Sequence, residues 1–213
     1  MRRVLALEGA VAGFSVAVVE GSFERASRTD GKRALEAGLA LIDALLAECG
    51  WRVRDLDGIA VGTGPGGFSG LRIAIAYAKG LALATGAPLA GISSYDAVEA
   101  CATDRPSIAV VSGRAGSACA RLRLGDEAEP AVVCGAVERV VDELDALLHG
   151  HKDAPVACHG LVEGVARELG ERGYIVRAHP LQEEPVALAI ARIAARRPER
   201  FGAARGVRPD YGT

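Results

Sequence analysis

The sequence predicts an α/β protein made of two related lobes, each with a mixed sheet flanked by helices. Short β-branched, apolar runs alternate with longer segments that have the apolar periodicity of helices. A strand, turn, strand pattern opens the chain, and the same pattern starts again at Ser107. Helical segments follow the strands in both halves, and this order is typical of α/β folds.

The first half is expected to begin with a hairpin, because two apolar runs flank the turn-prone Glu8-Gly9-Ala10. The polar segment 22–32 is expected to be a loop. A helix follows whose apolar face is wider than one packing surface needs, and Gly50 is expected to end it. The expected elements are strands 4–7 and 13–19, helix 35–49, strand 57–61, helix 69–85, strand 89–92 and helix 95–102.

The second half is expected to begin with the same strand, turn, strand order, and helices again follow strands. We expect a first lobe at 1–103 and a second at 104–213, with the last helix packing back on the first lobe. The expected elements are strands 107–111 and 118–124 around a turn at 112–116, helix 137–148, strand 155–158, helix 161–172 and helix 185–197.

Composition excludes several classes of protein. Apolar residues make up 50% of the chain and the formal net charge is -2, so a purely electrostatic RNA binder and a disordered acidic tail are both disfavoured. Glu8 interrupts the first apolar run, which argues against a signal peptide, and Lys79 interrupts the apolar stretch 74–90. We therefore expect a cytoplasmic protein with no membrane segment.

The cysteines are odd in number and widely spaced, with no CxxC pair, so we expect reduced, mostly buried thiols. His149 and His151, or Cys158 with His159, could bind a metal only if folding gathered them. The helical HExxH spacing is missing, and we expect no metal site. The cysteines are Cys49, Cys101, Cys119, Cys134 and Cys158.

A glycine loop joins strand 57–61 to helix 69–85 and allows two interpretations. In the first, the glycines let the chain turn sharply and Ser69 caps the helix. In the second, the loop binds an anion or a nucleotide through Gly64, Gly66, Gly67, Ser69 and the cation of Arg72. The loop matches GxGxxG, but Pro65 removes one N–H donor, and a Walker A lysine is absent.

The stretch GTGPGGFSGLRIAIAYAKGLA resembles the GxGPGSFTGLRxGxxxAKGLA signature of the TsaB (YeaZ) family. Ser94 and Ala97 lie where the family's SSLxA motif continues. Weaker similarity includes Pro185, Ala187 and the end VRPDY. The resemblance implies the actin-like, Hsp70-like, sugar-kinase-like ATPase fold (ASKHA, ribonuclease H-like), with two lobes built on βββαβα cores.

The resemblance also implies a function in making N6-threonylcarbamoyladenosine at position 37 of tRNA. Members are non-catalytic subunits that bind a TsaD paralogue, which carries the chemistry, and the ATPase TsaE joins them. No cofactor or metal is implied for the subunit itself, and ATP or ADP would bind only at an interface of the complex. Contact with tRNA would be indirect, and the isolated chain could form a homodimer.

Family members pair through two helices of the first lobe, which makes 1–103 the expected partner-binding lobe. Here these helices correspond to 35–49 and 69–85, and the second carries a ridge of small residues. An exposed apolar stripe favours a partner, although both stripes could instead form lobe core. The interface residues expected are Leu35, Leu39, Ile42, Leu46, Phe68, Gly70, Leu71, Ala74, Ile75, Ala78 and Ala82.

Three segments depart from the family pattern. Glu8-Gly9-Ala10 replaces the usual D-T-S of the first strand, and Ser112-Gly113-Arg114 replaces an aspartate-alanine-arginine turn. The His-Ser-Glu segment before the first long helix is replaced by Gly31-Lys32-Arg33-Ala34. Two carboxylate positions that would organise Mg²⁺ and water are thus altered, which disfavours independent ATP hydrolysis, although the longer side chain of Glu8 could still reach a metal.

The alternative function is an autonomous ATP-binding protein or small-molecule kinase of the same fold, suggested by the glycine loop and Glu8. A metallopeptidase is set aside because no two-histidine helical site is present. Whether tRNA touches the subunit stays open, since the basic cluster near the last helix could be a solvated helix end. That cluster is Arg192, Arg196, Arg197 and Arg200.

Overall fold

The computed structural model describes residues 2–11, 13–29, 37–100, 102–112, 116–161, 163–181 and 184–212. These residues form two compact units. The first contains Met1–Ala97 and Glu183–Tyr211, and the second contains Val98–Gln182 with Gly212–Thr213. We expected the first lobe to end at residue 103, whereas the first segment of the first unit ends at Ala97. The last helix is grouped with the first unit.

The first unit is built on a five-stranded mixed sheet in the order β3-β2-β1-β4-β5. Strands β1, β2 and β3 form an antiparallel meander, whereas β4 and β5 run parallel to β1. The expected opening hairpin is therefore confirmed. The bounds are β1 (Val4–Glu8), β2 (Phe14–Glu20), β3 (Phe23–Thr29), β4 (Gly58–Gly62) and β5 (Leu89–Ile92).

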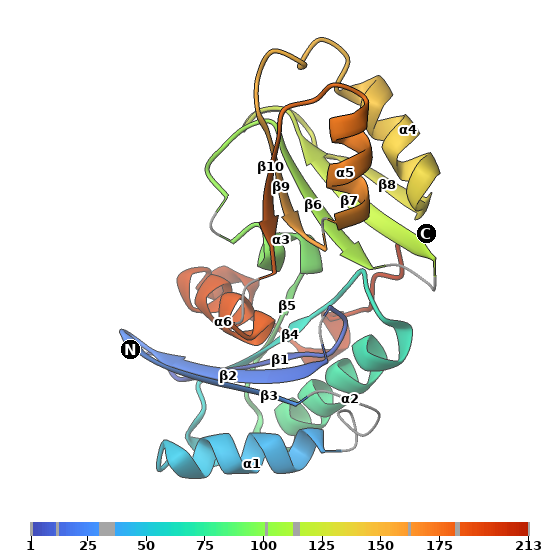
Figure 1. Cartoon of the computed structure of the whole chain (residues 1–213). Helices are drawn as coiled ribbons and strands as arrows, with labels where there is room; N and C mark the ends of the chain where they lie inside the picture. The colour runs from blue at the N-terminus through green and yellow to red at the C-terminus, as the bar shows by residue number, and fades with distance from the viewer. Residues whose placement is uncertain are drawn as a thin grey trace. The chain divides into compact units, whose positions relative to one another are not determined.

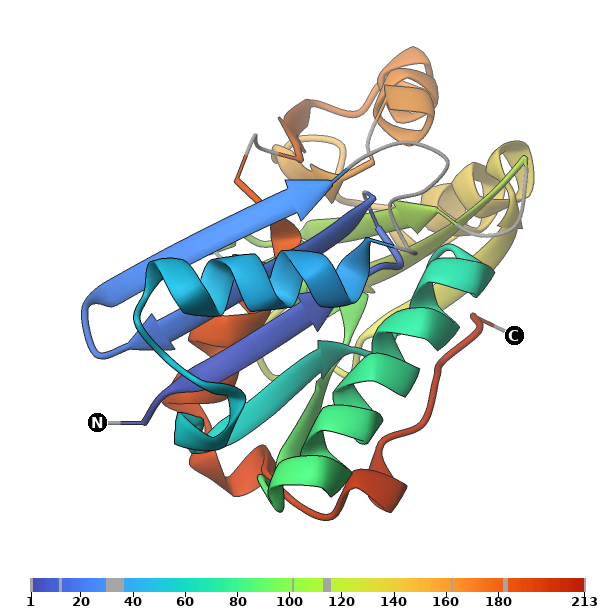
Figure 2. The same ribbon diagram turned by 90° about the horizontal axis from the view of Figure 1, so that it is seen from below.

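Helices cover both faces of this sheet, as Figures 1 and 2 show. Helices α1 (Gly38–Glu48) and α2 (Phe68–Thr85) lie on one face, where Leu5 and Leu7 of β1 join their apolar side chains in one core. Helix α6 (Val186–Arg196) packs on β1 and β2 from the other face. The shorter elements are η1 (Val53–Asp55), α3 (Ser94–Val98), η2 (Pro198–Arg200) and η3 (Ala204–Gly206).

The second unit repeats this topology with strand order β10-β9-β6-β7-β8. Again three antiparallel strands are followed by two parallel ones, and α4 and α5 pack on one face of the sheet (Figure 1). The expected repeat of strand pattern in the two halves is confirmed. The bounds are β6 (Ser107–Ser112), β7 (Ser117–Arg123), β8 (Ala131–Ala136), α4 (Val137–Leu147), β9 (Val156–Gly160), α5 (Glu163–Glu171) and β10 (Val176–Pro180).

Three strands were not expected from the sequence. Strand β3 falls in the segment that we expected to be a loop, and β8 and β10 fall between expected elements. All three are edge strands with mostly half-buried or exposed residues. Backbone hydrogen bonds to one neighbour define such strands, so their side chains carry little apolar alternation.

Two helix boundaries also differ from expectation. Helix α3 ends at Val98, four residues before the expected end at Ala102. Helix α2 begins at Phe68 with Gly67 as its N-cap and has no side-chain cap, so the expected capping by Ser69 is wrong. Gly86, with a φ of 75°, ends α2 in the left-handed conformation that glycine adopts easily. The start of helix 35–49 lies outside the described residues.

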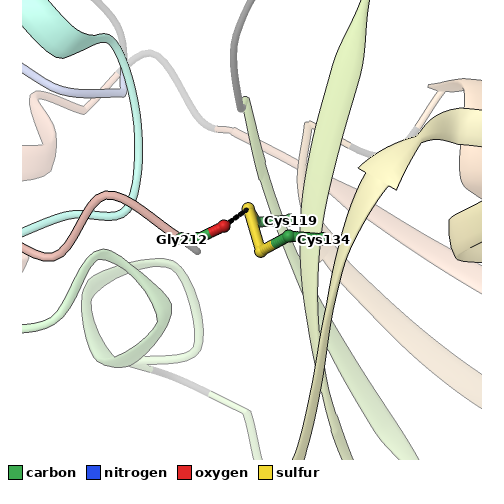
Figure 3. The surroundings of a disulfide bond; sticks show 3 residues. All are labelled: Cys119, Cys134 and Gly212. Carbon is green, nitrogen blue, oxygen red and sulfur yellow. Dashed lines mark hydrogen bonds between the residues drawn. A yellow bond between two sulfur atoms is a disulfide. The ribbon is translucent and has the colours of Figure 1, made fainter.

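Cys119 and Cys134 form a disulfide between β7 and β8 (Figure 3), which corrects the expectation of reduced thiols for this pair. The two residues are direct partners in the antiparallel register, and their Cα atoms are 4.2 Å apart. Because β8 was not expected, nothing in the sequence placed the two thiols together. Cys49 and Cys158 are free, while Cys101 lies outside the described residues.

An ion-pair network fixes α6 to the edge of the first sheet. The Arg192 guanidinium donates to both carboxylate oxygens of Glu24 on β3, at 2.6 to 3.1 Å, and also to Glu184. The hydrogen bond from Arg192 lowers the pKa of Glu24, against an opposing effect of burial.

Among the described residues, no helix combines the length and apolar character that a membrane crossing requires.

Candidate functional site

The glycine loop begins where β4 ends, beside the carboxyl end of the parallel strand β1. The carboxyl ends of parallel strands are the usual place for ligands in open α/β sheets. The two strands pair directly and run parallel, so the connections that leave their carboxyl ends lie close together. Gly62, the last residue of β4, lies against the Glu8 side chain that ends β1.

The turn after β1 packs directly on the glycine loop and on the start of α2. The backbone N–H of Gly67 donates a 2.7 Å hydrogen bond to the carbonyl oxygen of Ala10. A Cβ atom on Gly66 would overlap that same carbonyl group, and one on Gly70 would overlap the backbone of Gly9. Glycine is therefore required at Gly66 and Gly70, because the backbones approach closely there. The N–H of Gly67 is already used in a hydrogen bond within the protein.

Glu8 stands where the resemblance expects an aspartate, and its side chain is buried. Its Oε1 atom accepts hydrogen bonds from the backbone N–H groups of Ala10 at 2.5 Å and Val11 at 3.0 Å. The carboxylate thus organises the turn that follows it. Within the described residues, no group of three or more His, Cys, Asp or Glu side chains is arranged to hold a metal.

Two further segments of the first unit close over the loop. The carbonyl oxygen of Gly64 accepts a 2.7 Å hydrogen bond from the N–H of Ser94, and the N–H of Asp210 donates to the carbonyl oxygen of Thr63 at 2.7 Å. A Cβ on Gly64 would overlap the Asp210 carbonyl group. The glycine loop is therefore hydrogen-bonded to three segments of its own unit, namely the turn at Ala10, the start of α3 at Ser94 and the C-terminal segment at Asp210.

The remaining residues of the expected anion site lie on the first turn of α2. Ser69 is exposed, and the Arg72 guanidinium lies over the ring of Phe68, with its carbon 5.1 Å from the ring centroid. The Phe68 ring in turn packs on Tyr211, at 5.2 Å between centroids. The structure thus brings Ser69 and Arg72 near the loop, but Arg72 stacks on an aromatic ring.

Most of the expected interface residues lie in the core of the first unit, which corrects their assignment to a surface. They point toward the sheet, because α1 and α2 bury their most apolar sides there. Leu39 and Phe68 are exposed at 48% and 52%, and Leu35 lies outside the described residues. The buried residues are Ile42, Leu46, Gly70, Leu71, Ala74, Ile75, Ala78 and Ala82.

The outward faces of α1 and α2 carry a second set of small and apolar residues. On α2, Ala76, Gly80 and Ala84 are exposed at four-residue spacing, and Leu83 beside them is 79% exposed. On α1, Ala40, Ala44, Ala47 and Leu39 are exposed. We call these residues the helix surface. The sequence contains the same small-residue spacing on both sides of α2, so periodicity alone could not tell the outward side from the inward one.

The second unit contains a pair of histidines, one on β9 and one on β10. His159 and His179 are register partners, and their rings stack at 4.6 Å between centroids. Burial lowers the pKa of His159, and the charge of His179 adds to this effect. Cys158 is buried among the helix-facing residues, and burial raises the pKa of its thiol to about 12. Since successive strand residues point to opposite faces, Cys158 and His159 cannot share a ligand.

Comparison with known proteins identifies the family. A family model described as "tRNA N6-adenosine threonylcarbamoyltransferase" (TsaD) matches residues 31–160, more than half of the chain. The TsaB protein of Escherichia coli is 35% identical over 97 residues, which are 43% of this chain and 40% of that protein. The transferase of Paracoccus denitrificans is 48% identical over 52 residues, 24% of this chain and 15% of that protein. The matches thus span less than half of these relatives.

The fold of the whole chain is also that of a known structure. YeaZ from Pseudomonas aeruginosa superposes with a TM-score of 0.75 at 24% identity, covering 99% of this chain and 100% of that one. This chain has two five-stranded mixed sheets flanked by helices, and together with the likeness to YeaZ this confirms the expected actin-like fold. The chain belongs to the tRNA N6-adenosine threonylcarbamoyltransferase (TsaD) family and is similar to the TsaB (YeaZ) proteins.

Proposed function

We propose that this protein is a non-catalytic subunit that binds a TsaD-like paralogue through the helix surface and so supports synthesis of N6-threonylcarbamoyladenosine in tRNA. The observation that carries the proposal is the pair of outward faces on α1 and α2, where exposed alanine, glycine and leucine residues outnumber the exposed charged residues Asp43, Glu48 and Arg72. Small residues in four-residue rows let a second helix pair approach closely. An exposed apolar row of this kind is typical of an interface.

The proposal that the subunit is not an ATPase on its own rests on the glycine loop. The N–H of Gly67 is bonded to Ala10, and Glu8 is bonded to its own turn. A phosphate would have to displace both contacts, which argues against the alternative of an autonomous ATP-binding protein or kinase. Nucleotide, in this proposal, binds only at an interface of the complex, where a TsaE-like ATPase also joins.

The test is association with a TsaD-like protein, measured by co-purification and by sedimentation. Ala44→Arg with Gly80→Arg adds two charges to the helix surface and should abolish association, while the variant stays folded because both positions are exposed. Ala146→Arg makes the same change at an exposed position of α4 and should associate normally. Failure of the unmodified chain to bind at micromolar concentration would contradict the proposal.

Two further readouts complete the test. In a strain that lacks its own TsaB, the unmodified chain should restore modified adenosine in tRNA, and the doubly charged variant should not. Titration of Mg-ATP into the isolated chain should give no heat. The same helix surface should also pair two copies of the isolated chain, as sedimentation would show.

A further inference from the structure

A depression of about 520 Å³ lies on the first unit, beside the edge strand β5. Three arginines line it, Arg200, Arg205 and Arg208, and all three come from the C-terminal segment 198–210, which we call the strap. Gly91 of β5 and Gly202 and Gly206 of the strap also line it. The helix surface contributes no residue to this depression.

Positive charge is concentrated here against the composition of the chain. The strap contains three arginines and two acidic residues, Glu199 and Asp210, and all three arginines but neither carboxylate line the depression, whereas the whole chain has a formal net charge of -2. Arg200 is partly neutralised by Asp96, at 3.3 Å. Arg205 and Arg208 are exposed and have no ion pair within the described part of the chain. Two guanidinium groups are therefore left available for an anion.

The strap holds these arginines on a fixed backbone. Leu89 and Gly202 exchange two backbone hydrogen bonds, at 2.9 and 3.0 Å, and the N–H of Asp210 bonds to Thr63. Val207, between the last two arginines, is buried in the core of the unit. Because the backbone is anchored on both sides of Arg205 and Arg208, binding would cost little ordering of the chain.

The edge of β5 adds a backbone donor. Pro88 and Ile92 direct their carbonyl oxygens toward β4, and Leu89 directs its polar groups outward to Gly202. By the alternation of a strand, Gly91 also faces outward, into the depression. A Cβ atom on Gly202 or Gly206 would meet nothing within 4 Å, so the rim is open and a phosphate can approach the backbone.

A second depression of about 300 Å³, near Arg192 and Arg196, serves as a comparison. There Arg192 is bonded to Glu24 and Glu184, and Glu24 itself lines the depression. An anion would meet a carboxylate at that place. The strap depression has no acidic residue among its lining, and so it is the better anion site.

We propose that the strap depression binds phosphate groups of an RNA strand, and that this strand is the tRNA of the modification complex, a statement that rests on the proposed function. No aromatic side chain lines the depression, so it offers no stacking surface for the base of a mononucleotide. Arginines and a backbone N–H on an open rim fit sequence-independent contacts to a phosphate backbone.

The experiment measures fluorescence anisotropy of a labelled tRNA transcript with adenosine at position 37. The chain is titrated alone and in complex with its TsaD-like partner, over a range of salt. The charge-reversal variant is Arg205→Glu with Arg208→Glu, and Gly206→Leu fills the open rim without changing charge or adding an aromatic ring. Each charge reversal is also made singly, and Arg54→Glu, at an exposed arginine outside the depression, is the control with the same change in net charge as either single variant.

We expect the double charge reversal to weaken tRNA binding about tenfold or more, and to lower the slope of log affinity against log salt by about two. Gly206→Leu should also weaken binding, and Arg54→Glu should stay within about twofold of the unmodified chain. Equal affinity in the double variant and the unmodified chain, or equal losses in the double variant and Arg54→Glu, would overturn the proposal.

Two other outcomes would also overturn it. One is a complex that binds tRNA no better than the TsaD-like protein alone. The other is competition by inorganic phosphate or ATP at the depression with tRNA affinity unchanged by the variants, which would indicate a small-anion site. Association with the TsaD-like protein is measured for the same variants. Loss of tRNA binding with association intact separates this inference from failure of the proposed function.

Discussion

The backbone N–H of Gly67 donates a 2.7 Å hydrogen bond to the carbonyl oxygen of Ala10, so the turn after β1 closes the glycine loop. The loop resembles a phosphate-binding loop in composition, but its glycines serve contacts between backbones. Gly66 meets Ala10, and Gly70 meets Gly9. The glycine loop is therefore a packing junction in this chain.

Gly70 and Gly80 lie on the same helix and should respond oppositely to alanine. Gly70→Ala forces a Cβ into the Gly9 carbonyl and should lower the free energy of unfolding by about 1 to 3 kcal/mol. Gly80→Ala meets open space in a helix interior and should raise it by about 0.5 to 1 kcal/mol. Urea unfolding followed by Trp51 fluorescence measures both, because this single tryptophan lies in the first unit. An unchanged free energy of unfolding in Gly70→Ala would contradict the close packing of Gly70 on Gly9.

Replacing Glu8 by the aspartate of the family should weaken the turn and create no enzyme. In Glu8→Asp the carboxylate is one methylene shorter, so it withdraws from the N–H groups of Ala10 and Val11. Leaving buried N–H groups unsatisfied should cost about 1 to 3 kcal/mol in unfolding free energy. Phosphate release from Mg-ATP should stay at background. Hydrolysis that appears only in Glu8→Asp would contradict this account of the loop.

The disulfide between Cys119 and Cys134 should stabilise the second unit. It spans 15 residues of sequence, and closing a loop of that length contributes about 3 kcal/mol in the chain-entropy description. Cys119→Ser with Cys134→Ser should therefore increase amide hydrogen exchange in β7 and β8, with Cys49→Ser as the control. Alkylation of the unreduced protein should leave this pair unmodified and also Cys158, whose pKa burial raises to about 12. Labelling of Cys119 without reduction would contradict the disulfide.

The sequence was sufficient for the strand, turn, strand pattern that opens each half and for the long helices, because apolar periodicity reports burial directly. It was insufficient for β3, β8 and β10, whose pairing is made by backbone groups. Missing β8 also hid the Cys119–Cys134 pair. On α2, small residues recur on both sides, and the direction of the sheet decides that Ala78 is core and Gly80 is surface. The arginines of the strap gather beside β5 because Gly202 pairs with Leu89, a contact that no local pattern predicts.

The ion pair between Arg192 and Glu24 should make the first unit sensitive to acid. Arg192 holds the pKa of Glu24 below its ordinary 4.5, so the stabilisation is present above pH 4.5 and is lost as pH falls through the lower, folded value. In Arg192→Gln the Glu24 carboxylate lacks this guanidinium partner, so this acid-dependent loss of stability should be absent. The stability difference from the unmodified chain should then be constant above about pH 5.5 and shrink as pH falls below 4.5. Arg139→Gln, which breaks an exposed pair with Glu143 on α4, should leave the first unit unchanged. Trp51 fluorescence during urea unfolding, repeated from pH 3 to 7, measures this difference, and a difference that is the same at both ends would show that the pair has no effect on acid stability.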